Sequence, residues 1–382
     1  MQKELVTPPK QIHVPKTLDV EAVERALSEL WQKTTEHPDE SEGAVMRARA
    51  ANLMVFVTRE DALPETQQTI NELALLHPCR ALVMMADYEG PDIDIEMFVS
   101  AFCQEERRTK KTELCCEEVT LIARGNFTTE LPSAATPLLV SDLPVFLWLQ
   151  DLKRLEDNTF QSLTRTSERL VIDSVDLPPA SFDLDAFPEL FMRQGSQAIA
   201  VNDINWSRLT SWRSLLASFY DVPEYRAELA DLQRVSIEYL SPSGDPNGVA
   251  TQALLIAGWL ASRLQWTIVA KESKSGLSTY RASTREGKAL DLELRRVEHP
   301  AMKPGRLAMV ELQSAAAVFT VRRADNGLHL ETEATLEGRS CPGRTLPVRN
   351  RSTAHLLSRE MEILRPDIPY EDAMRVAASF VT

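Results

Sequence analysis

Residues 137–149 read PLLVSDLPVFLWL, and the second half of this stretch decides the fold class of the N-terminal part of the chain. Its last five residues, VFLWL at 145–149, form a continuous apolar run of strand length. An apolar run without polar alternation is typical of a strand buried on both faces, as in a parallel or mixed sheet with helices on either side. Pro144 precedes the run, and proline suits the first position of a strand but not its interior. We therefore predict a central strand over residues 145–149.

Ser141 and Asp142 lie at the mouth of this predicted strand. They suit contacts with a ligand or a partner, and they equally suit a turn in which their oxygens accept hydrogen bonds from nearby backbone N–H groups. The general preference of these residue types for turns favours the second role.

Strand and helix patterns alternate over residues 45–230. The predicted strands are 51–57, 81–85, 145–149, 169–173 and 198–201, and the predicted helices are 62–76, 131–140, 160–167 and 182–195. The order of strand 51–57, helix 62–76 and strand 81–85 is a β-α-β unit, which implies parallel pairing. Residues 93–102 and 114–123 predict a β-hairpin. We expect an α/β domain with a mixed, largely parallel sheet flanked by helices, preceded by an N-terminal arm and helix over residues 1–44.

Residues 231–382 predict a smaller α+β domain with antiparallel strands. A strand at 235–240 and a helix at 249–263 open it, and short segments follow at 266–270, 277–282, 287–297, 305–313, 317–323 and 327–333. The dipeptide Asn326-Gly327 between apolar runs is a hairpin signal. Two C-terminal helices, at 353–364 and 370–381, are separated by Pro366 and Pro369.

The composition indicates a globular protein that binds neither nucleic acid nor membrane. The 382 residues include 42 Lys and Arg against 56 Asp and Glu, a formal charge of −14, without a strong basic cluster. No apolar run approaches the roughly 18 residues of a membrane span, and the N-terminus lacks a signal-peptide core. The five cysteines contain no CxxC pair, so neither a zinc site nor a disulfide framework is indicated. We expect a cytoplasmic protein.

Catalytic motifs are absent from the sequence. It contains no GxGxxG, GxxxxGK[ST], GxSxG or HExxH, and glycine is scarce, with 13 residues. His77 and Cys79 are adjacent to Pro78, but neighbours entering a strand point to opposite faces. Cys341 lies in a Gly/Pro loop near two arginines, which favour the reactive thiolate. We predict no catalytic residue, metal or cofactor, and we keep Cys341 as a redox candidate beside the simpler interpretation of an ordinary loop cysteine.

A cluster of tryptophan and arginine lies in residues 202–220, NDINWSRLTSWRSLLASFY. Tryptophan and arginine are enriched in the hot spots of protein interfaces. Aromatic side chains nevertheless pack inside more often than they bind, and arginine stems cover apolar surface. The predicted helix 249–263 has a similar pair. The candidate partner-binding residues are therefore Trp206, Arg208, Trp212, Arg213, Trp259 and Arg263, and internal packing is the favoured alternative for the cluster.

Five stretches, in this order, resemble one protein family. They are LHPCRALVMMAD (76–87), PLLVSDLPVFLWL (137–149), RLVIDS (169–174), DINWSRLTSWRSLLASFYD (203–221) and LLIAGWLASRLQW (254–266). The sequence resembles the OpcA-type glucose-6-phosphate dehydrogenase assembly proteins of bacteria over about residues 45–270. The resemblance implies an N-terminal α/β domain followed by a C-terminal domain. It also implies a non-enzymatic partner that binds glucose-6-phosphate dehydrogenase, promotes its active oligomer and supports NADPH production in the oxidative pentose phosphate pathway.

A second hypothesis is an α/β enzyme or sugar-phosphate-binding protein, with its site at the strand ends near Asp142, Asp173 and Asp203. Three acidic residues with few lysines make a poor phosphate site without a metal. The two hypotheses predict different surfaces: an assembly protein needs a large protein interface, whereas a ligand-binding protein needs a closed pocket with converging polar groups.

Overall fold

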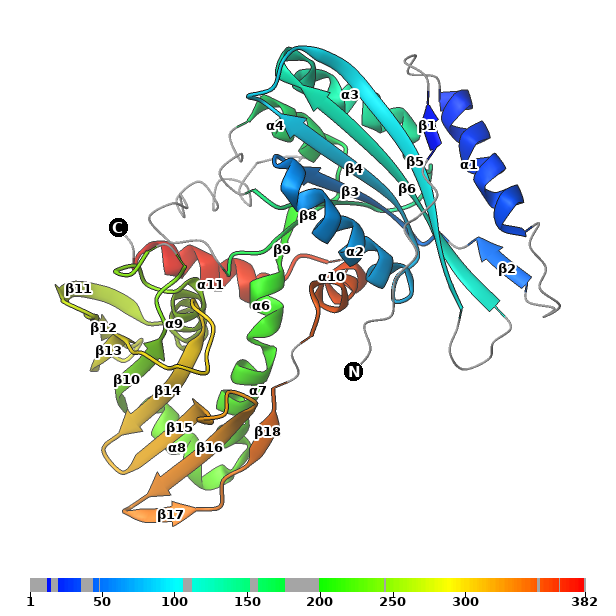
Figure 1. The fold of residues 1–382 in the computed structure, drawn as a ribbon. Helices are drawn as coiled ribbons and strands as arrows, with labels where there is room; N and C mark the ends of the chain where they lie inside the picture. The colour runs from blue at the N-terminus through cyan, green and yellow to red at the C-terminus, as the bar shows by residue number, and fades with distance from the viewer. Residues whose placement is uncertain are drawn as a thin grey trace. The chain divides into compact units, whose positions relative to one another are not determined.

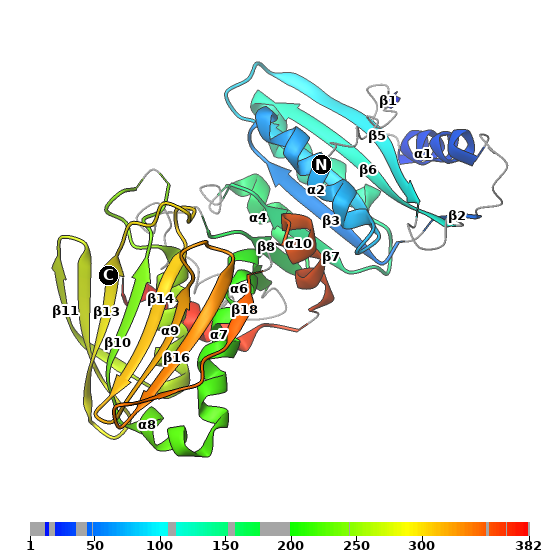
Figure 2. The same ribbon diagram turned by 60° about the horizontal axis from the view of Figure 1, so that its bottom comes forward.

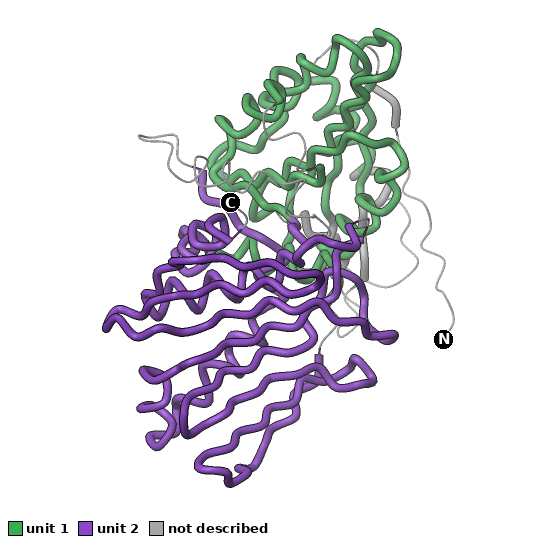
Figure 3. The backbone as a smooth tube through the Cα atoms, turned by 90° about the vertical axis from the view of Figure 1, so that its left-hand side faces the viewer, with its two compact units in different colours: residues 1–172, 351–364 green, residues 173–350, 365–382 purple. Residues whose placement is uncertain are grey.

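The structure is a computed structural model that describes residues 12–14, 20–35, 44–47, 49–105, 112–151, 157–175, 199–243, 245–348, 351–363 and 365–380. The chain forms two compact units (Figure 3). Unit 1 comprises residues 1–172 and 351–364, and unit 2 comprises residues 173–350 and 365–382. The predicted helix at 182–195 lies outside the described residues. None of the described helices has the length and apolar composition needed to cross a membrane.

Unit 1 contains a mixed, largely parallel sheet (Figure 1). Its strands are β1 (Ile12–Val14), β2 (Ala44–Arg47), β3 (Ala51–Val57), β4 (Cys79–Asp87), β5 (Ile93–Glu105), β6 (Thr112–Arg124), β7 (Val145–Leu149) and β8 (Arg169–Ile172). They lie in the order β1-β5-β6-β4-β3-β7-β8, with β2 also paired to β6. The strands β6, β4, β3, β7 and β8 are parallel, and β5 forms the antiparallel hairpin with β6. The predicted α/β class is confirmed.

Strand β7 matches the predicted strand at 145–149 residue for residue. It pairs in parallel with β3 on one side and β8 on the other, so it is an interior strand. Phe146, Leu147 and Leu149 are at most 1% exposed. The continuous apolar run is therefore explained by cover on both faces, as expected for parallel strands.

The helices of unit 1 cover both faces of this sheet. They are α1 (Val20–Thr35), η1 (Glu60–Ala62), α2 (Leu63–Ala74), η2 (Gly125–Glu130), α3 (Leu131–Ala135), η3 (Thr136–Leu138), α4 (Asn158–Arg165) and α10 (Thr353–Glu362). Figure 1 shows α2 in front of the parallel strands and α3 behind them. Ile70 and Leu73 of α2 are fully buried, and α10 packs on α2.

Unit 2 contains a second, mostly antiparallel sheet. Its strands are β10 (Leu232–Tyr239), β11 (Thr267–Lys274), β12 (Leu277–Ser283), β13 (Ala289–Arg296), β14 (Leu307–Ser314), β15 (Ala317–Arg323), β16 (His329–Leu336), β17 (Arg339–Cys341) and β18 (Thr345–Pro347). The order is β11-β12-β13-β10-β14-β15-β16-β17, with β18 also paired to β16. Only the β10–β13 pair is parallel among the described pairings. This sheet confirms the antiparallel strands predicted from the sequence. The two predicted C-terminal helices are present as α10, which belongs to unit 1, and α11 (Ile368–Ala378), which belongs to unit 2.

One face of the second sheet is apolar and packs against helices. The remaining elements of unit 2 are β9 (Ala200–Asp203), α6 (Ile204–Arg208), α7 (Thr210–Ser218), η6 (Phe219–Asp221), η7 (Pro223–Tyr225), α8 (Arg226–Ala230), α9 (Thr251–Leu264) and α11 (Ile368–Ala378). On β10, Val235, Ile237 and Tyr239 are at most 3% exposed. Helix α9 packs on β10 and on α11.

The compact units divide after Ile172, whereas the sequence patterns suggested a change of domain near residue 230. The segment between these positions joins the second sheet through aromatic contacts. The rings of Phe219, Tyr220 and Tyr225 lie 5.2, 5.5 and 5.0 Å from the ring of Phe319 on β15. These contacts join residues about a hundred positions apart, so local patterns give no sign of them.

Candidate functional site

The end of β9 gathers several of the predicted site residues in unit 2. Asp203 is the last residue of β9 and the N-cap of α6, because its Oδ1 accepts from the backbone N–H of Asn205 at 2.8 Å. The same carboxylate accepts from the Ser174 backbone N–H at 3.1 Å and from Ser174 Oγ at 2.6 Å. Tyr370 Oη donates to Asp203 Oδ2 at 3.4 Å. Four donors from three parts of the chain therefore surround one buried carboxylate.

The network continues from Asn205 into the helices and the sheet. Asn205 Nδ2 donates to Ser174 Oγ at 3.1 Å, and Asn205 Oδ1 accepts from Gln252 Nε2 at 2.8 Å. Gln252 Oε1 in turn accepts from the backbone N–H of Leu307 at 3.2 Å. A connected and buried polar network of this kind specifies one arrangement of the elements that it joins. It ties α6, α9 and α11 to the start of β14.

Electrostatics at Asp203 are set by burial. Burial, and after it the neighbouring Asp173 carboxylate, raise the pKa of the Asp203 carboxyl to about 7, although the donors from Ser174 and Asn205 oppose the rise. Asp173 is itself paired with Arg208, whose Nη1 and Nη2 donate to its two oxygens at 2.6 and 2.7 Å. The structure thus brings Asp173, Asp203 and Arg208 together in one cluster, whose polar groups interact with one another inside the protein.

Trp206 is held in place by three partners in unit 2. Its Nε1 donates to Asp367 Oδ2 at 2.9 Å, and Asp367 is also the N-cap of α11. The guanidinium carbon of Arg213 lies 3.3 Å from the centre of the Trp206 ring, a cation–π contact. The Tyr370 ring lies 5.7 Å away. These contacts match the packing alternative for this tryptophan.

The other candidate partner-binding residues differ in exposure. Trp212 is 2% exposed, so little of its ring reaches the surface. Trp259 is half-buried on α9, and Arg263, one turn later, is exposed and pairs with Asp372 of α11. Internal contacts account for the buried tryptophans, and partner binding by the six candidates stays a prediction.

Asp142 and Cys341 take no part in the hydrogen bonds described for Asp203. Asp142 belongs to unit 1, is exposed, and adopts a left-handed backbone conformation with φ of 63°, as turn residues of this type tolerate. Cys341 is the half-buried last residue of β17, and its Sγ donates to the Arg339 carbonyl at 3.7 Å. Cys341 also raises the pKa of the Tyr225 hydroxyl by hydrogen bonding. Its redox role stays a prediction.

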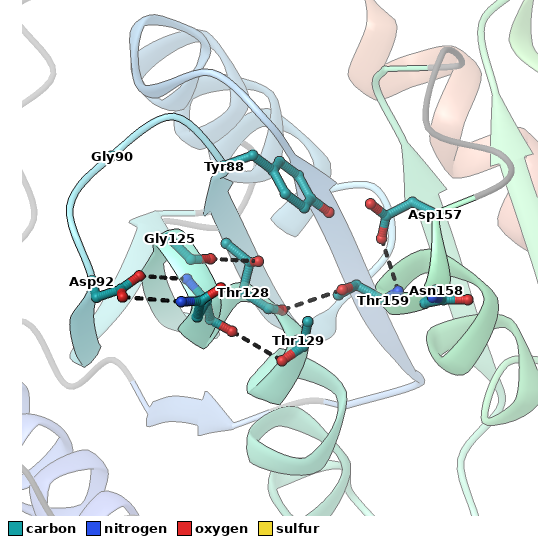
Figure 4. Close-up of a pocket in the computed structure, with 10 residues that line it drawn as sticks. Tyr88, Gly90, Asp92, Gly125, Thr128, Thr129, Asp157, Asn158 and Thr159 are labelled. Atoms are coloured by element: carbon teal, nitrogen blue, oxygen red, sulfur yellow. Dashed lines mark hydrogen bonds between the residues drawn. The ribbon is translucent and has the colours of Figure 1, made fainter.

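Unit 1 has a pocket of about 410 Å³ where β4 and β6 end (Figure 4). It is lined by Tyr88, Gly90, Asp92, Gly125, Asn126, Thr128, Thr129, Asp157, Asn158 and Thr159. Many of the polar groups bond to one another: Asn126 donates from its backbone and its side chain to Asp92, and Asp157 caps α4. The ten lining residues include no lysine, arginine or histidine. A phosphate group would therefore find no cation among them.

The parallel strands of unit 1 follow the order of nucleotide-binding sheets. Numbered along the chain from β3 and leaving out β5, they read 3-2-1-4-5 across the sheet. In such sheets a glycine-rich turn after the first strand lets the backbone approach a pyrophosphate, which sits on a helix N-terminus. Here residues 58–62 read TREDA, without glycine, and Pro64 removes an N–H from the first turn of α2.

The side chains of this turn already form hydrogen bonds within the protein, and several of them are carboxylates. Arg59 Nε donates to Asp61 Oδ1 at 2.9 Å, and Thr58 Oγ1 donates to Asp151 Oδ2 at 2.9 Å. Glu60 adds a third carboxylate to this edge of the sheet. These residues do not fit a dinucleotide, because its pyrophosphate would meet carboxylates instead of backbone donors.

Sequence reasoning missed the other members of the hydrogen-bond network around Asp203. Ser174, Asn205, Gln252 and Tyr370 were not singled out, since their contacts connect distant parts of the chain. One local signal was present: Asp203 directly precedes the helical segment 204–208, the position where aspartate caps a helix. Among the described residues there is no cluster of three or more potential metal ligands.

Comparison with known proteins gives two matches from one family. The family model for the N-terminal domain of the glucose-6-phosphate dehydrogenase subunit matches residues 70–188. The family model for the C-terminal domain of the same subunit matches residues 199–374. The chain belongs to the OpcA family. The resemblance inferred from the five sequence stretches is thus confirmed.

Two curated relatives carry the name OpcA. A protein of Nostoc punctiforme named as OxPP cycle protein OpcA is 34% identical over 206 residues, which cover 54% of this chain and 42% of the relative. The OpcA protein of Synechococcus elongatus is 27% identical over 317 residues, covering 81% of this chain and 69% of the relative. The match to the Nostoc relative therefore spans about two fifths of its length.

Among solved structures, a 3-ketoreductase from Actinomadura kijaniata has a similar fold. The TM-score is 0.50 at 9% identity, covering 87% of this chain and 96% of the ketoreductase. That structure was solved with NADP and TDP-benzene. At this identity the likeness concerns the fold alone.

Proposed function

We propose that this OpcA-family protein is a non-catalytic partner of glucose-6-phosphate dehydrogenase. It binds the enzyme and promotes its active oligomer, and it thereby supports NADPH production in the oxidative pentose phosphate pathway. The observation that carries this proposal is the order of the two matched domains, both described as parts of a glucose-6-phosphate dehydrogenase subunit. The curated relatives, named for the OxPP cycle, add support.

The chemistry of unit 1 supports a role without turnover. The sheet has the strand order of nucleotide-binding folds, but its first turn carries carboxylates and a proline where a pyrophosphate needs glycine and free N–H groups. The pocket at the strand ends offers no cation to a phosphate. We infer that the fold serves here as a scaffold for protein contacts.

Activation requires a difference in affinity between enzyme states. A protein that binds the active and inactive states of an enzyme equally shifts nothing, however tightly it binds. The protein must therefore favour the active oligomer, and its effect must saturate when the enzyme is fully bound.

A kinetic titration tests the proposal. Glucose-6-phosphate dehydrogenase from the same organism is assayed for NADPH formation while this protein is added. The proposal predicts a saturable rise in rate or a fall in KM. An unchanged rate and KM at all concentrations, in reducing and in oxidising buffer, would contradict it.

Binding of a sugar phosphate remains the second candidate, because the unit 1 pocket lies at the carboxyl ends of parallel strands, where ligands bind in related sheets. A thermal-shift screen with sugar phosphates and nucleotides separates the two functions. Stabilisation by a sugar phosphate, without any effect on the dehydrogenase, favours the second candidate.

A further inference from the structure

The second sheet has one face that the described helices leave uncovered. Side chains alternate along each strand, so Arg234, Ser236 and Glu238 of β10 point away from the helix-covered face where Val235 and Ile237 are buried. Figure 2 looks onto this side of the sheet, with α9 and α11 behind the strands. We call the surface formed by the outward residues of β10 to β16 the open face.

The strand register places a row of glutamates across the middle of the open face. Ser236 pairs with Glu293 on one side and with Glu311 on the other, and Glu311 pairs with Thr320. Thr320 in turn pairs with Glu333. From β13 to β16 the row therefore holds three carboxylates and no cation of its own, and through Thr279 it continues to Glu272 of β11, which pairs with Lys274.

Two of these three glutamates are neutralised by arginines from neighbouring rows. Glu293 lies 3.5 Å from Arg234 and 3.2 Å from Arg295, and Glu333 lies 3.1 Å from Arg322. These two carboxylates already have cationic partners within the chain, so a further ion pair with a binding partner would add little binding energy.

Glu311, and its diagonal neighbour Glu238 on β10, have no such arginine partner among the described residues. Glu311 accepts a long hydrogen bond from Thr320 Oγ1 at 3.5 Å. Over the described residues, neither Glu311 nor Glu238 forms an ion pair within 4 Å. Burial raises the pKa of Glu238; Arg295 opposes the rise, and Glu311 adds to it. Two neighbouring carboxylates thus lie half-buried at the centre of the face without a cation in contact.

The dimensions of the open face suit a protein interface. From β11 to β16 the sheet path has six inter-strand spacings, which at about 4.8 Å each give a width of roughly 29 Å. Strands of seven or eight residues add a length of roughly 25 Å. The resulting area of roughly 700 Å² is close to the roughly 800 Å² per partner that standard interfaces bury.

The two carboxylates without a cation indicate which kind of partner the open face would bind. A second copy stacked through the same face about a twofold axis would bring the Glu238 and Glu311 carboxylates toward those of its mate, and like charges in contact are destabilising. Nucleic acid and anionic membranes carry the wrong sign. A protein surface with arginine or lysine side chains is complementary.

We propose that the open face is the docking surface for the dehydrogenase partner, and that Glu238 and Glu311 receive arginine or lysine side chains from it. This inference rests on the proposed function. Partner cations would give the two carboxylates the charge-assisted hydrogen bonds that they lack within the chain. Binding should therefore weaken as ionic strength rises.

The test compares two charge-reversed forms of the full chain. The double variant Glu238→Lys with Glu311→Lys changes the centre of the face. The control variant Glu224→Lys with Glu298→Lys makes the same change in net charge at exposed residues of unit 2 outside the sheet strands. Binding to the dehydrogenase is measured by calorimetry and activation by NADPH formation, and thermal melting checks that each variant is folded.

We expect the face variant to bind at least tenfold more weakly than wild type, and the control to bind within twofold of wild type. A milder variant, Glu238→Gln with Glu311→Gln, should show a smaller loss and a weaker salt dependence. Wild-type affinity in the folded face variant overturns the docking face while the proposed function stands. If the wild-type protein itself does not bind the dehydrogenase, both the proposed function and the docking face are contradicted. A wild-type dimer that the face variant dissociates would assign the face to a second copy and overturn the inference.

Discussion

Glu118 of β6 is a carboxylate buried in the layer between the unit 1 sheet and α2. Its Oε1 accepts from Thr120 Oγ1 at 2.9 Å and from Gln67 Nε2 at 3.2 Å. Its Oε2 is buried without a hydrogen-bond partner among the described residues, as is Oδ1 of Asn71, one turn after Gln67 on α2. Burial raises the pKa of Glu118 to about 7, against the two donors. We expect the neutral carboxyl to be the form that this layer accommodates.

The raised pKa predicts the sign of a pH effect on stability. Between its unfolded pKa, about 4.3, and about 7, Glu118 is protonated in the folded protein and ionised in the unfolded chain. Its contribution to the free energy of unfolding is therefore full below pH 4 and falls as the pH rises to 7, by on the order of 3 kcal/mol. The variant Glu118→Gln should lose this slope and should be more stable than wild type at pH 8.

Urea unfolding at pH 5 and pH 8 checks this expectation. The exposed turn variant Glu89→Gln is the matched control and should keep the wild-type difference between the two pH values. If Glu118→Gln shows the same pH difference as wild type, the carboxyl is ionised in the folded protein and the interpretation is wrong.

Ser174 is the residue on which the Asp203 network depends. Its hydroxyl donates to Asp203 and accepts from Asn205 Nδ2, and it is fully buried. The variant Ser174→Ala should lower the free energy of unfolding by about 1–3 kcal/mol, because a buried amide donor and a carboxylate oxygen lose their partner. Chemical denaturation measures the loss, with Ser162→Ala on the exposed side of α4 as a control expected to lie near wild type. Equal midpoints for the two variants would count against the network.

At the scale of elements, the crossing of α9 and α11 depends on Gly258. A Cβ atom placed on Gly258 would lie 2.1 Å from the Ala373 carbonyl oxygen of α11, closer than real contacts allow. The variant Gly258→Ala should therefore destabilise unit 2 by about 1–3 kcal/mol, despite the higher helix propensity of alanine. A thermal melt measures the effect. An unchanged or higher melting temperature would show that the helices are not packed this closely.

At the C-terminus of α9, a substitution to glycine is expected to raise the stability of the protein. Gln265 caps α9 in the left-handed conformation with φ of 56°. Glycine adopts this conformation without the cost that a Cβ imposes, so Gln265→Gly should stabilise the protein by roughly 1 kcal/mol. The change should appear as a higher urea midpoint with an unchanged slope. A lower midpoint would contradict the assigned cap geometry.

The elements differ in how well the sequence predicted them. Strands β3, β7 and β15 match their predicted ranges residue for residue, since each is an apolar or alternating run that the sheet buries. Strands β1, β2, β17 and β18 were not predicted. Each has only three or four residues, too few for a pattern to appear.

The candidate site was predicted only in part, because its contacts join residues that are far apart in the sequence. Asp173, Asp203 and Arg208 were singled out as strand-end or partner-binding residues, and the structure joins them in one cluster. Their partners lie far away in the sequence: Ser174 is 29 residues from Asp203, and Tyr370 is 167 residues from it. Composition and spacing carry no record of such pairings, which arise only when the fold brings the segments together.

At the scale of the whole molecule, the family assignment, the unit 1 scaffold and the acidic open face point to the same role. The chain has a net charge of −14, and net charge of one sign promotes encounter with a partner surface of the other sign. These observations support our proposal that the protein is a binding partner of glucose-6-phosphate dehydrogenase.

The most direct test is size-exclusion chromatography with light scattering on a mixture of the two proteins at several ratios, with NADPH formation assayed across the fractions. We expect a co-eluting complex whose mass exceeds that of the dehydrogenase alone, together with higher specific activity in the same fractions. Two separate peaks with unchanged specific activity, in reducing and in oxidising buffer, would contradict it.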